Sequence, residues 1–197
     1  PTMQEELRKV TDSFGMLTKE ETDIIIDSAN IQSFKKGAIL LREGQVAKEC
    51  FFVLKGLVRE YYIKDGEEKS TNFFVEKEPV NSFTSRNSNK PSRHFLVCAE
   101  DTVLTVGTNS LEEEMCELIP RLGNIIRQEV EKETGKMQDD MASRLTSTPE
   151  ELYLDLVENR PELLNRVPQH QIASYIGVKP ETLSRIRKKL MNAKHTR

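Results

Sequence analysis

The sequence predicts an α+β fold: an antiparallel β-roll of the jelly-roll type, then a long helix, then a helical C-terminal domain. Three observations predict it. Short runs rich in Val, Phe, Tyr and Leu are separated by glycines between residues 31 and 108. A helical pattern of about 25 residues follows from residue 122. The last 30 or so residues combine short apolar spacings with a strongly basic composition.

The composition is that of a soluble globular protein of one or two domains, with 197 residues, 37% hydrophobic and 31% charged. No apolar run approaches the ~20 residues of a membrane span, and the first ten residues lack an apolar signal core, so we expect a cytoplasmic protein with no membrane partner. Cys50, Cys98 and Cys116 stand far apart. This spacing argues against a disulfide framework, a zinc knuckle or an iron–sulfur cluster, so free thiols and no cofactor or metal are expected.

Two short helices are predicted before the roll. Leu7, Val10 and Phe14 recur at helical spacing. Residues 18–21, Thr-Lys-Glu-Glu, have the form of a capping box and precede the apolar run at 24–26.

The roll itself is expected to hold at least seven short strands within about 80 residues, because turn signals fall between the apolar runs. These signals are Gly37, Gly44, Gly56 and Asp65-Gly66. The polar segment 76–93 is expected to be a loop, either functional or a tolerated insertion. We assign residues 1–109 to this β-roll sensor domain.

A helical dimerisation or linker segment is assigned to residues 110–147. Residues 110–113, Ser-Leu-Glu-Glu, have the form of a second capping box, and Pro120 should interrupt the helix that follows. An apolar stripe then runs through Leu122, Ile126, Val130, Met137, Met141 and Leu145. We interpret it as a dimer seam, although a helix packed only on its own barrel would show a similar stripe.

The C-terminal domain is assigned to residues 148–197. It opens at residues 148–151, Thr-Pro-Glu-Glu, which combine an N-cap, Pro at the first helical position and Glu at the third. Its first-helix core candidates are Leu152, Leu154, Leu156 and Val157.

Residues 167–190 predict two short helices joined by a tight turn. The first carries Ile172, Ala173 and Ile176 at helical spacing, and Gly177 provides the backbone freedom that a sharp turn needs. The second has an apolar stripe of Leu183, Ile186 and Leu190, while polar and basic residues occupy its other faces. This is the pattern of a helix-turn-helix whose second helix enters a DNA major groove.

The charge distribution favours DNA over the alternative, an ordinary helical hairpin with a solvated basic face. Residues 165–197 hold eight Lys or Arg and one Asp or Glu, a balance of +7, whereas the whole chain is −3, so residues 1–164 carry −10. An acidic body with a basic terminal domain is expected when one part of a protein meets phosphate and the rest does not.

Together these segments resemble the Crp/Fnr family of bacterial transcription regulators, typified by the cyclic-AMP receptor protein and the fumarate–nitrate reduction regulator. The most specific matches are Gln171-Ile172-Ala173, Ile176-Gly177 and residues 181–185, Glu-Thr-Leu-Ser-Arg. The roll adds the glycine framework of Gly37, Glu43-Gly44, Phe52-Val53-Leu54, Gly56 and Val58. The resemblance covers about residues 17–190. It implies a cyclic-nucleotide-binding-like roll and a winged helix-turn-helix.

By this resemblance, Glu181, Ser184 and Arg185 would read the bases of a half-site containing TTGA. Arg185 can donate two bonds to a guanine edge, Glu181 can accept from cytosine N4, and an ion pair between them could orient both. Pro180 stands where the cyclic-AMP branch often has an arginine. The expected phosphate contacts are Gln169, Thr182, Arg187, Lys188 and Lys189.

The effector pocket departs from the cyclic-AMP pattern. In that pattern a Gly-Glu-Leu-Ala element holds the ribose and an arginine pairs with the phosphate. Here the arginine position falls on Ser92, with Arg93 one place off, and residues 80–83 contain neither Gly nor Glu. We therefore expect no tight binding of cyclic AMP, and an effector that is unknown or absent. The candidate pocket residues are Ser82, Phe83, Ser92 and Arg93.

The predicted function is a homodimeric, sequence-specific DNA-binding transcription regulator. Its expected partners are double-stranded DNA with a TTGA-containing palindrome and a second copy of the chain, with RNA polymerase as a further candidate. Two alternatives stay open: a cyclic-nucleotide-responsive regulator with altered pocket contacts, and a ligand-binding module that acts through a protein partner. An enzyme is disfavoured because no nucleophile-elbow motif occurs in the sequence.

Overall fold

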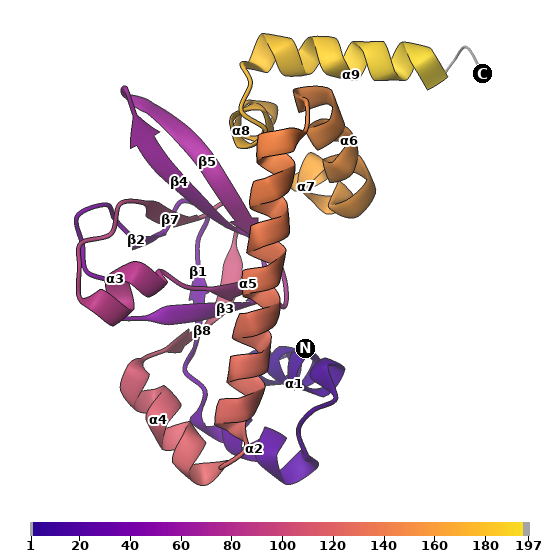
Figure 1. Cartoon of the computed structure of the whole chain (residues 1–197). Coiled ribbons are helices and arrows are strands. Elements are labelled where there is room, and N and C mark those ends of the chain that lie inside the picture. Colours follow the sequence, from indigo (N-terminus) through magenta and orange to yellow (C-terminus); the bar gives the residue numbers. More distant parts are fainter. Residues whose placement is uncertain (1, 195–197) are drawn as a thin grey trace. The chain divides into compact units, whose positions relative to one another are not determined.

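The computed structural model describes residues 2–194 and divides the chain into two compact units (Figure 1). Unit 1 comprises the chain up to residue 62 together with residues 72–130. Unit 2 comprises residues 63–71 and the chain from residue 131 onward. Within the described residues, none of the helices has the length and apolar character needed to cross a membrane.

Two four-stranded sheets form the roll, ordered β1-β8-β3-β6 and β2-β7-β4-β5, and all of their strands except the end of β4 and most of β5 belong to unit 1. The strands are β1 (Ile31–Phe34), β2 (Ile39–Leu41), β3 (Cys50–Lys55), β4 (Val58–Lys64), β5 (Glu67–Phe74), β6 (Pro79–Val80), β7 (Phe95–Cys98) and β8 (Thr102–Gly107). The apolar core between them includes Val53, Val58, Val80, Leu96 and Leu104, each at most 1% exposed. The predicted antiparallel roll is confirmed, and the described residues hold eight strands.

The two helices predicted before the roll are present, and they pack against its outside. They are α1 (Met3–Phe14) and α2 (Lys19–Ser28). Leu7, Val10 and Ile26 pack with Leu54 of β3 in one buried cluster. Apolar spacing at these positions thus gives each helix one face that the roll covers.

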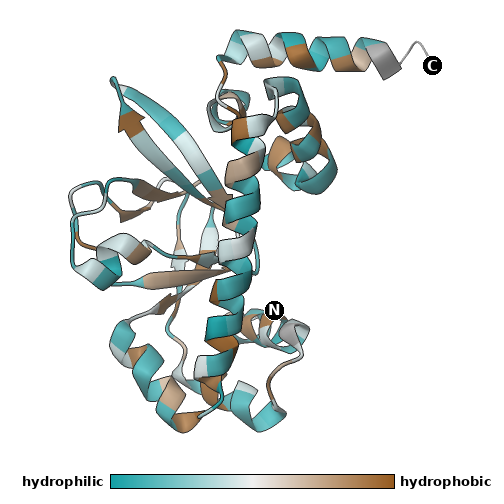
Figure 2. Cartoon of the chain, in the orientation of Figure 1, coloured by the Kyte–Doolittle hydropathy of each residue, from teal (hydrophilic) through white to brown (hydrophobic). Residues whose placement is uncertain are grey.

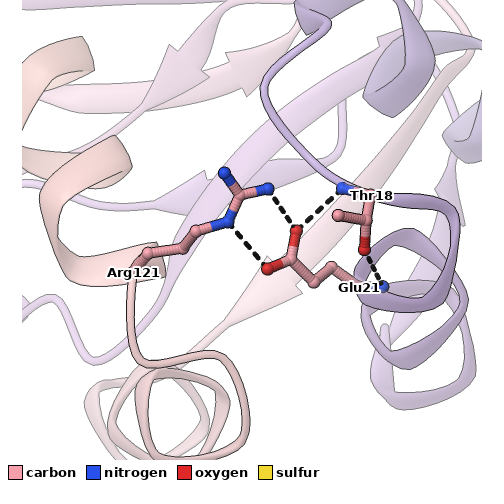
Figure 3. A network of polar contacts seen from close by, with 3 residues as sticks. All are labelled: Thr18, Glu21 and Arg121. Atoms are coloured by element: carbon pink, nitrogen blue, oxygen red, sulfur yellow. Dashed lines mark hydrogen bonds and ion pairs between the residues drawn. The ribbon is translucent and has the colours of Figure 1, made fainter.

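The helix α2 is fixed at its start by a polar network (Figure 3). Thr18 Oγ1 accepts from the Glu21 amide, and the Thr18 amide donates to Glu21 Oε2 at 2.7 Å, which completes the predicted capping box. Arg121, just before the long helix, donates from Nε to Glu21 Oε1 at 2.7 Å and from Nη2 to Oε2. The Arg121 guanidinium and the capping contacts lower the pKa of Glu21 from 4.5 to about 2.

Two local expectations were wrong. The segment 76–93 is not a loop, since it contains strand β6 and a short helix, α3 (Phe83–Ser88). Ser85 of α3 is buried, and its hydroxyl accepts from the Ala47 amide at 2.8 Å. The polar composition of this segment therefore did not reveal that it is ordered. The helix α4 (Asn109–Leu118) is capped by Thr108, which accepts from the Leu111 amide, and not by Ser110.

The long helix α5 (Leu122–Thr146) begins after Pro120, as predicted, and runs for 25 residues. Its first turns lie against unit 1, where Leu122 and Ile126 pack with Met115 and Ile119 of the α4 region. The later apolar residues are solvent-exposed: Val130 is 41% exposed, Met137 and Met141 are each 64% exposed, and Leu145 is 76% exposed. Figure 2 shows apolar turns interrupting a largely hydrophilic helix. The stripe therefore has an intramolecular half and an exposed half.

Unit 2 continues with four helices: α6 (Pro149–Asn159), α7 (Pro161–Arg166), α8 (Gln169–Tyr175) and α9 (Pro180–Lys194). The N-terminus of α6 carries the full capping box of Thr148 and Glu151, as predicted. The wing implied by the family resemblance is not found, because no strand follows β8 in the described residues. Only residue 160 separates α6 from α7, and residues 167–168 separate α7 from α8, so neither connection is long enough for a hairpin.

Candidate nucleic-acid interface and sensor cavity

The helix pair α8–α9 has the predicted turn between its helices. Ile172, Ala173, Ile176 and Leu183 are buried, at 7% exposure or less, and form the contact between the two helices. Gly177 has φ +79°, a left-handed conformation that other residues rarely adopt. The Val178 amide donates to the Ala173 carbonyl across the turn at 2.9 Å. This geometry fixes the direction in which α9 leaves the turn.

The helix α9 presents its polar residues to solvent on one face. Leu183 is 1% exposed and lies on the packed face. Glu181, Ser184, Arg185 and Lys188 are all exposed. Their spacing of three, four and seven residues from Glu181 puts them on the same side of a helix. We call these four residues the outward face of α9.

Arg185 has a different local partner from the one expected. Its Nη2 donates to Thr182 Oγ1 at 3.4 Å, a long bond within the same helix. In the described part of the chain, no ion pair joins Arg185 to Glu181, so the anticipated orienting pair is not formed. Arg185 is nevertheless exposed as a residue.

The residues predicted to contact phosphate lie in different settings. Gln169 and Lys188 are exposed, whereas Thr182 and Arg187 are half-buried on the flanks of α9. Lys189 Nζ donates to Glu150 Oε2 of α6 at 2.8 Å, so its cation has an acidic partner in the protein. An exposed pair of this kind contributes little free energy and exchanges readily with solvent or an anion.

Arg144, which the sequence analysis did not single out, holds the helix pair in unit 2. Its Nη1 donates to the Tyr175 carbonyl at 3.0 Å and its Nη2 to the Thr71 carbonyl at 3.2 Å, while its guanidinium carbon lies 4.2 Å from the Tyr175 ring centroid. Ser174 Oγ accepts from the Ser70 amide at 2.9 Å and donates to the Glu68 carbonyl at 3.2 Å. An arginine inside a long helix gives no sequence signal for such contacts with carbonyl oxygens.

A second candidate site is a cavity of about 340 Å³ in the roll. Its walls come from β2, β3, β7, the connection between β2 and β3, and the residue before α3. The described residues that line it include Lys48 and Glu49 but no arginine. A cation and a carboxylate side by side give the cavity no strong preference for an anion.

The four predicted pocket residues do not come together. Ser82 lines the cavity, but Phe83 is 44% exposed and Arg93 is exposed. Ser92 is buried for a structural reason: its hydroxyl donates to the His94 carbonyl at 2.9 Å and accepts from the His94 amide at 3.2 Å. The cavity is therefore lined by one of the four, together with Gln45, Lys48 and Glu49, which the sequence analysis missed.

An arginine that sequence reasoning also missed lies outside this cavity. The Arg86 side chain is 8% exposed, and its Nε and Nη1 have no hydrogen-bond partner. Its Nη2 lies 3.8 Å from Glu112 Oε2. Burial raises the pKa of the nearby Cys50 thiol, and the Arg86 charge opposes that shift.

The cysteines are free thiols, as expected, and burial raises the pKa of Cys98 to about 11. A thiol with a raised pKa is a weak nucleophile and a poor metal ligand at neutral pH. Among the described residues, no group of three or more His, Cys, Asp or Glu is placed to hold a metal ion.

Comparison with known families finds one match, the cyclic nucleotide-binding domain, over residues 31–115. No curated protein matches the sequence. The match covers β1 to β8 and most of α4, and it therefore includes all the residues that line the roll cavity.

The fold of the chain is shared by solved bacterial proteins. FixK2 from Bradyrhizobium japonicum has a TM-score of 0.69 at 20% identity, covering 84% of this chain and 86% of its own. The c-di-GMP-responsive global regulator CLP of Xanthomonas campestris has a TM-score of 0.69 at 15% identity, covering 90% and 93%. The Thermus thermophilus catabolite activator protein has a TM-score of 0.51 at 19% identity, covering 92% and 87%.

These likenesses establish the architecture that the sequence predicted, a roll followed by a long helix and C-terminal helices. Residues 31–115 thus match the cyclic nucleotide-binding domain, and the chain shares the fold of these three solved proteins.

Proposed function

We propose that this chain is a sequence-specific DNA-binding transcription regulator that acts as a homodimer. The observation that carries the proposal is the outward face of α9, where Glu181, Ser184, Arg185 and Lys188 are exposed together on the second helix of a helix-turn-helix. A major groove is about 12 Å wide and admits one such helix. The net charge of +7 in residues 165–197 favours a polyanionic partner.

In this proposal, Glu181, Ser184 and Arg185 read bases of a TTGA half-site. Arg185 donates to the O6 and N7 of the guanine, which requires its guanidinium to leave the 3.4 Å contact with Thr182. Lys188 and Gln169 contact phosphates, which position the helix without specifying the sequence. Lys189 does so after release from Glu150, and Thr182 and Arg187 contribute from the flanks of α9.

The proposed dimer contact is the exposed half of the α5 stripe, Met137, Met141 and Leu145. These residues recur every four positions and so form one apolar strip on the helix. Large exposed apolar strips are typical of protein interfaces, and a dimer would place two α9 helices for the two half-sites of a palindrome.

The sensor roll is proposed to lack the cyclic-AMP contacts of its family. Support comes from the cavity lining, which includes no arginine in the described residues, and from Ser92, whose hydroxyl is already occupied by His94. A phosphate without a guanidinium loses a strong charge-assisted hydrogen bond.

A second candidate is a cyclic-nucleotide-responsive regulator with altered contacts. The family match over residues 31–115 and the 340 Å³ cavity favour it. Isothermal titration with cyclic AMP, cyclic GMP and c-di-GMP decides between the two. The first proposal predicts no cyclic-AMP binding at micromolar concentration, and a micromolar or tighter dissociation constant would support the second.

DNA binding is tested by fluorescence anisotropy with a duplex containing two TTGA half-sites in palindromic arrangement, beside a duplex of the same composition with scrambled half-sites. Binding to the palindrome should be at least tenfold tighter, and the affinity should fall roughly 10³-fold or more between 50 and 200 mM salt. Equal affinity for the two duplexes would contradict sequence-specific reading. Salt-independent binding would favour the alternative in which the C-terminal helices meet a protein.

The dimer is tested by sedimentation of the full chain. Met141→Glu places a charge in the exposed strip and should shift the protein to monomer. Asp139→Lys, on the opposite face of α5, is the matched control and should leave the dimer intact. A monomeric wild-type chain in solution, or an unchanged dimer in Met141→Glu, would contradict this interface.

A further inference from the structure

A second pocket of unit 1, with a mostly apolar lining, lies outside the roll. Its walls are the two N-terminal helices, the outer side of β3, the end of β8, and α4. Its apolar lining includes Leu7 and Val10 of α1, Phe52 of β3, and Leu111 and Met115 of α4. Five separate elements contribute to the walls, and the pocket is partly open to solvent.

Several polar atoms in these walls already have partners within the protein. Thr11 Oγ1 donates to the Leu7 carbonyl at 2.8 Å, within α1. The Asn30 carbonyl accepts from the Val106 amide at 2.8 Å, and Asn30 Oδ1 accepts from Gln32. The wall thus gives a ligand apolar contact and few hydrogen bonds, which selects a hydrocarbon group over a nucleotide or an ion.

This pocket is separate from the roll cavity. The two share no lining residue in the described part of the chain. Consecutive residues of β3 divide them, since Phe51 lines the roll cavity and Phe52 lines the outer pocket. Side chains alternate across a strand, so one strand forms a wall of each.

The size of the pocket sets the size of its ligand. Its volume is about 280 Å³. An apolar cavity of about 150 Å³ in another protein stays dry and binds benzene, which has six carbon atoms. In proportion, this pocket accommodates roughly ten to twelve carbon atoms.

We propose that this outer pocket is a binding site for a hydrocarbon group of about ten carbon atoms, such as a medium-length alkyl or acyl chain, independent of any ligand in the roll. The site does not depend on the proposed DNA-binding function, because all of its walls belong to unit 1.

Isothermal titration of the full chain with straight-chain 1-alkanols from hexanol to dodecanol tests the proposal. Each added methylene should tighten binding about fourfold while it enters the pocket, and the gain should stop near ten carbons. Saturable binding at one site per chain with this plateau supports the proposal. The absence of saturable binding, or a gain that continues through dodecanol, would overturn it.

Two pocket-filling variants locate the site. Ala29→Leu and Thr105→Leu each add bulk to a lining residue, one from the end of α2 and one from β8, and each should weaken decanol binding at least tenfold. Ala142→Leu, an equal addition on exposed α5, is the control and should bind decanol like the wild type. If both pocket variants fold, as shown by unchanged circular dichroism, and bind decanol normally, the site lies elsewhere.

Discussion

The outward face of α9 and the roll cavity use their polar side chains in opposite ways. On α9, Glu181, Ser184 and Arg185 are exposed, and the only described partner of Arg185 is a hydroxyl at 3.4 Å. In the roll, Ser85 and Ser92 are buried and bonded to backbone groups. The first set is available to a partner, whereas the second holds the fold together.

This difference shows that polar side chains of one chain can have either of two roles, since some stabilise the fold and others remain exposed to a partner. The roll retains the two sheets, the glycine turns and a short helix after β6. Its Ser92, at the position expected for a ligand-binding arginine, instead holds the backbone of His94. The helix pair α8–α9, in contrast, has Glu181, Ser184 and Arg185 on an exposed face.

The strongest disruption of the α9 region should come from its core and not from its polar face. Leu183 is 1% exposed between α8 and α9, so Leu183→Ala should cost about 2–5 kcal/mol of unfolding free energy and abolish DNA binding. Urea denaturation followed by circular dichroism measures the cost. Ser184→Ala is the exposed neighbour for comparison, and equal destabilisation by the two changes would contradict the assigned packing.

Arg185→Ala and Lys188→Ala separate base reading from phosphate binding on the outward face. Arg185→Ala should lose about 1–3 kcal/mol on the TTGA duplex and little on the scrambled one. Lys188→Ala should weaken both duplexes alike and reduce the salt slope by about one. Anisotropy titrations at several salt concentrations measure both effects. The assignment fails if both variants lower both affinities equally.

A pair of serine substitutions sharpens the comparison directly. Ser92→Ala leaves the part-buried His94 amide without its acceptor and should cost about 1–3 kcal/mol of stability. Ser184→Ala should leave stability unchanged and reduce only DNA affinity. Thermal unfolding measures the stability of each variant, and DNA titration measures its affinity for the duplex. An unchanged melting temperature of the Ser92→Ala variant would show that the Ser92 hydroxyl does not stabilise the fold.

The smallest expected effect is a pH dependence in unit 1. The pKa of Glu21 falls from 4.5 to about 2 because of Arg121 and the cap, so its stabilising contribution is present above pH 4.5 and is lost as the pH falls toward 2. Glu21→Gln should therefore lower the melting temperature at pH 7 and differ little from wild type near pH 2. Thermal melts across this range check it, and a constant difference at every pH would contradict the ion pair.

Much of the fold follows from local chemistry that the sequence displays. The capping boxes at Thr18 and Thr148, the break at Pro120 and the turn at Gly177 depend on a few neighbouring residues, and all four were predicted. The helix α3 was missed because its stability depends on a contact between Ser85 and Ala47, 38 residues away. Long-range hydrogen bonds of this kind leave no periodic signal.

Of the two candidate sites, one could be predicted from the sequence and the other could not. Exposure of the α9 residues follows from the helical spacing of Leu183 and Ile186, so the outward face could be predicted. The roll cavity could not, because its lining comes from β2, β3, β7 and the chain between β2 and β3. The ion pair between Lys189 and Glu150 could not be predicted either, because it depends on how two separate helices pack.

The most direct test of the proposed reading of DNA by α9 is a double-mutant cycle that pairs Arg185→Ala with 7-deazaguanine in the TTGA half-site. Replacing N7 removes one acceptor that the guanidinium would use. The wild-type protein should lose affinity on the modified duplex, whereas the Arg185→Ala variant should bind the modified and normal duplexes equally. An equal loss by both proteins would show that Arg185 does not contact this guanine and would contradict the account.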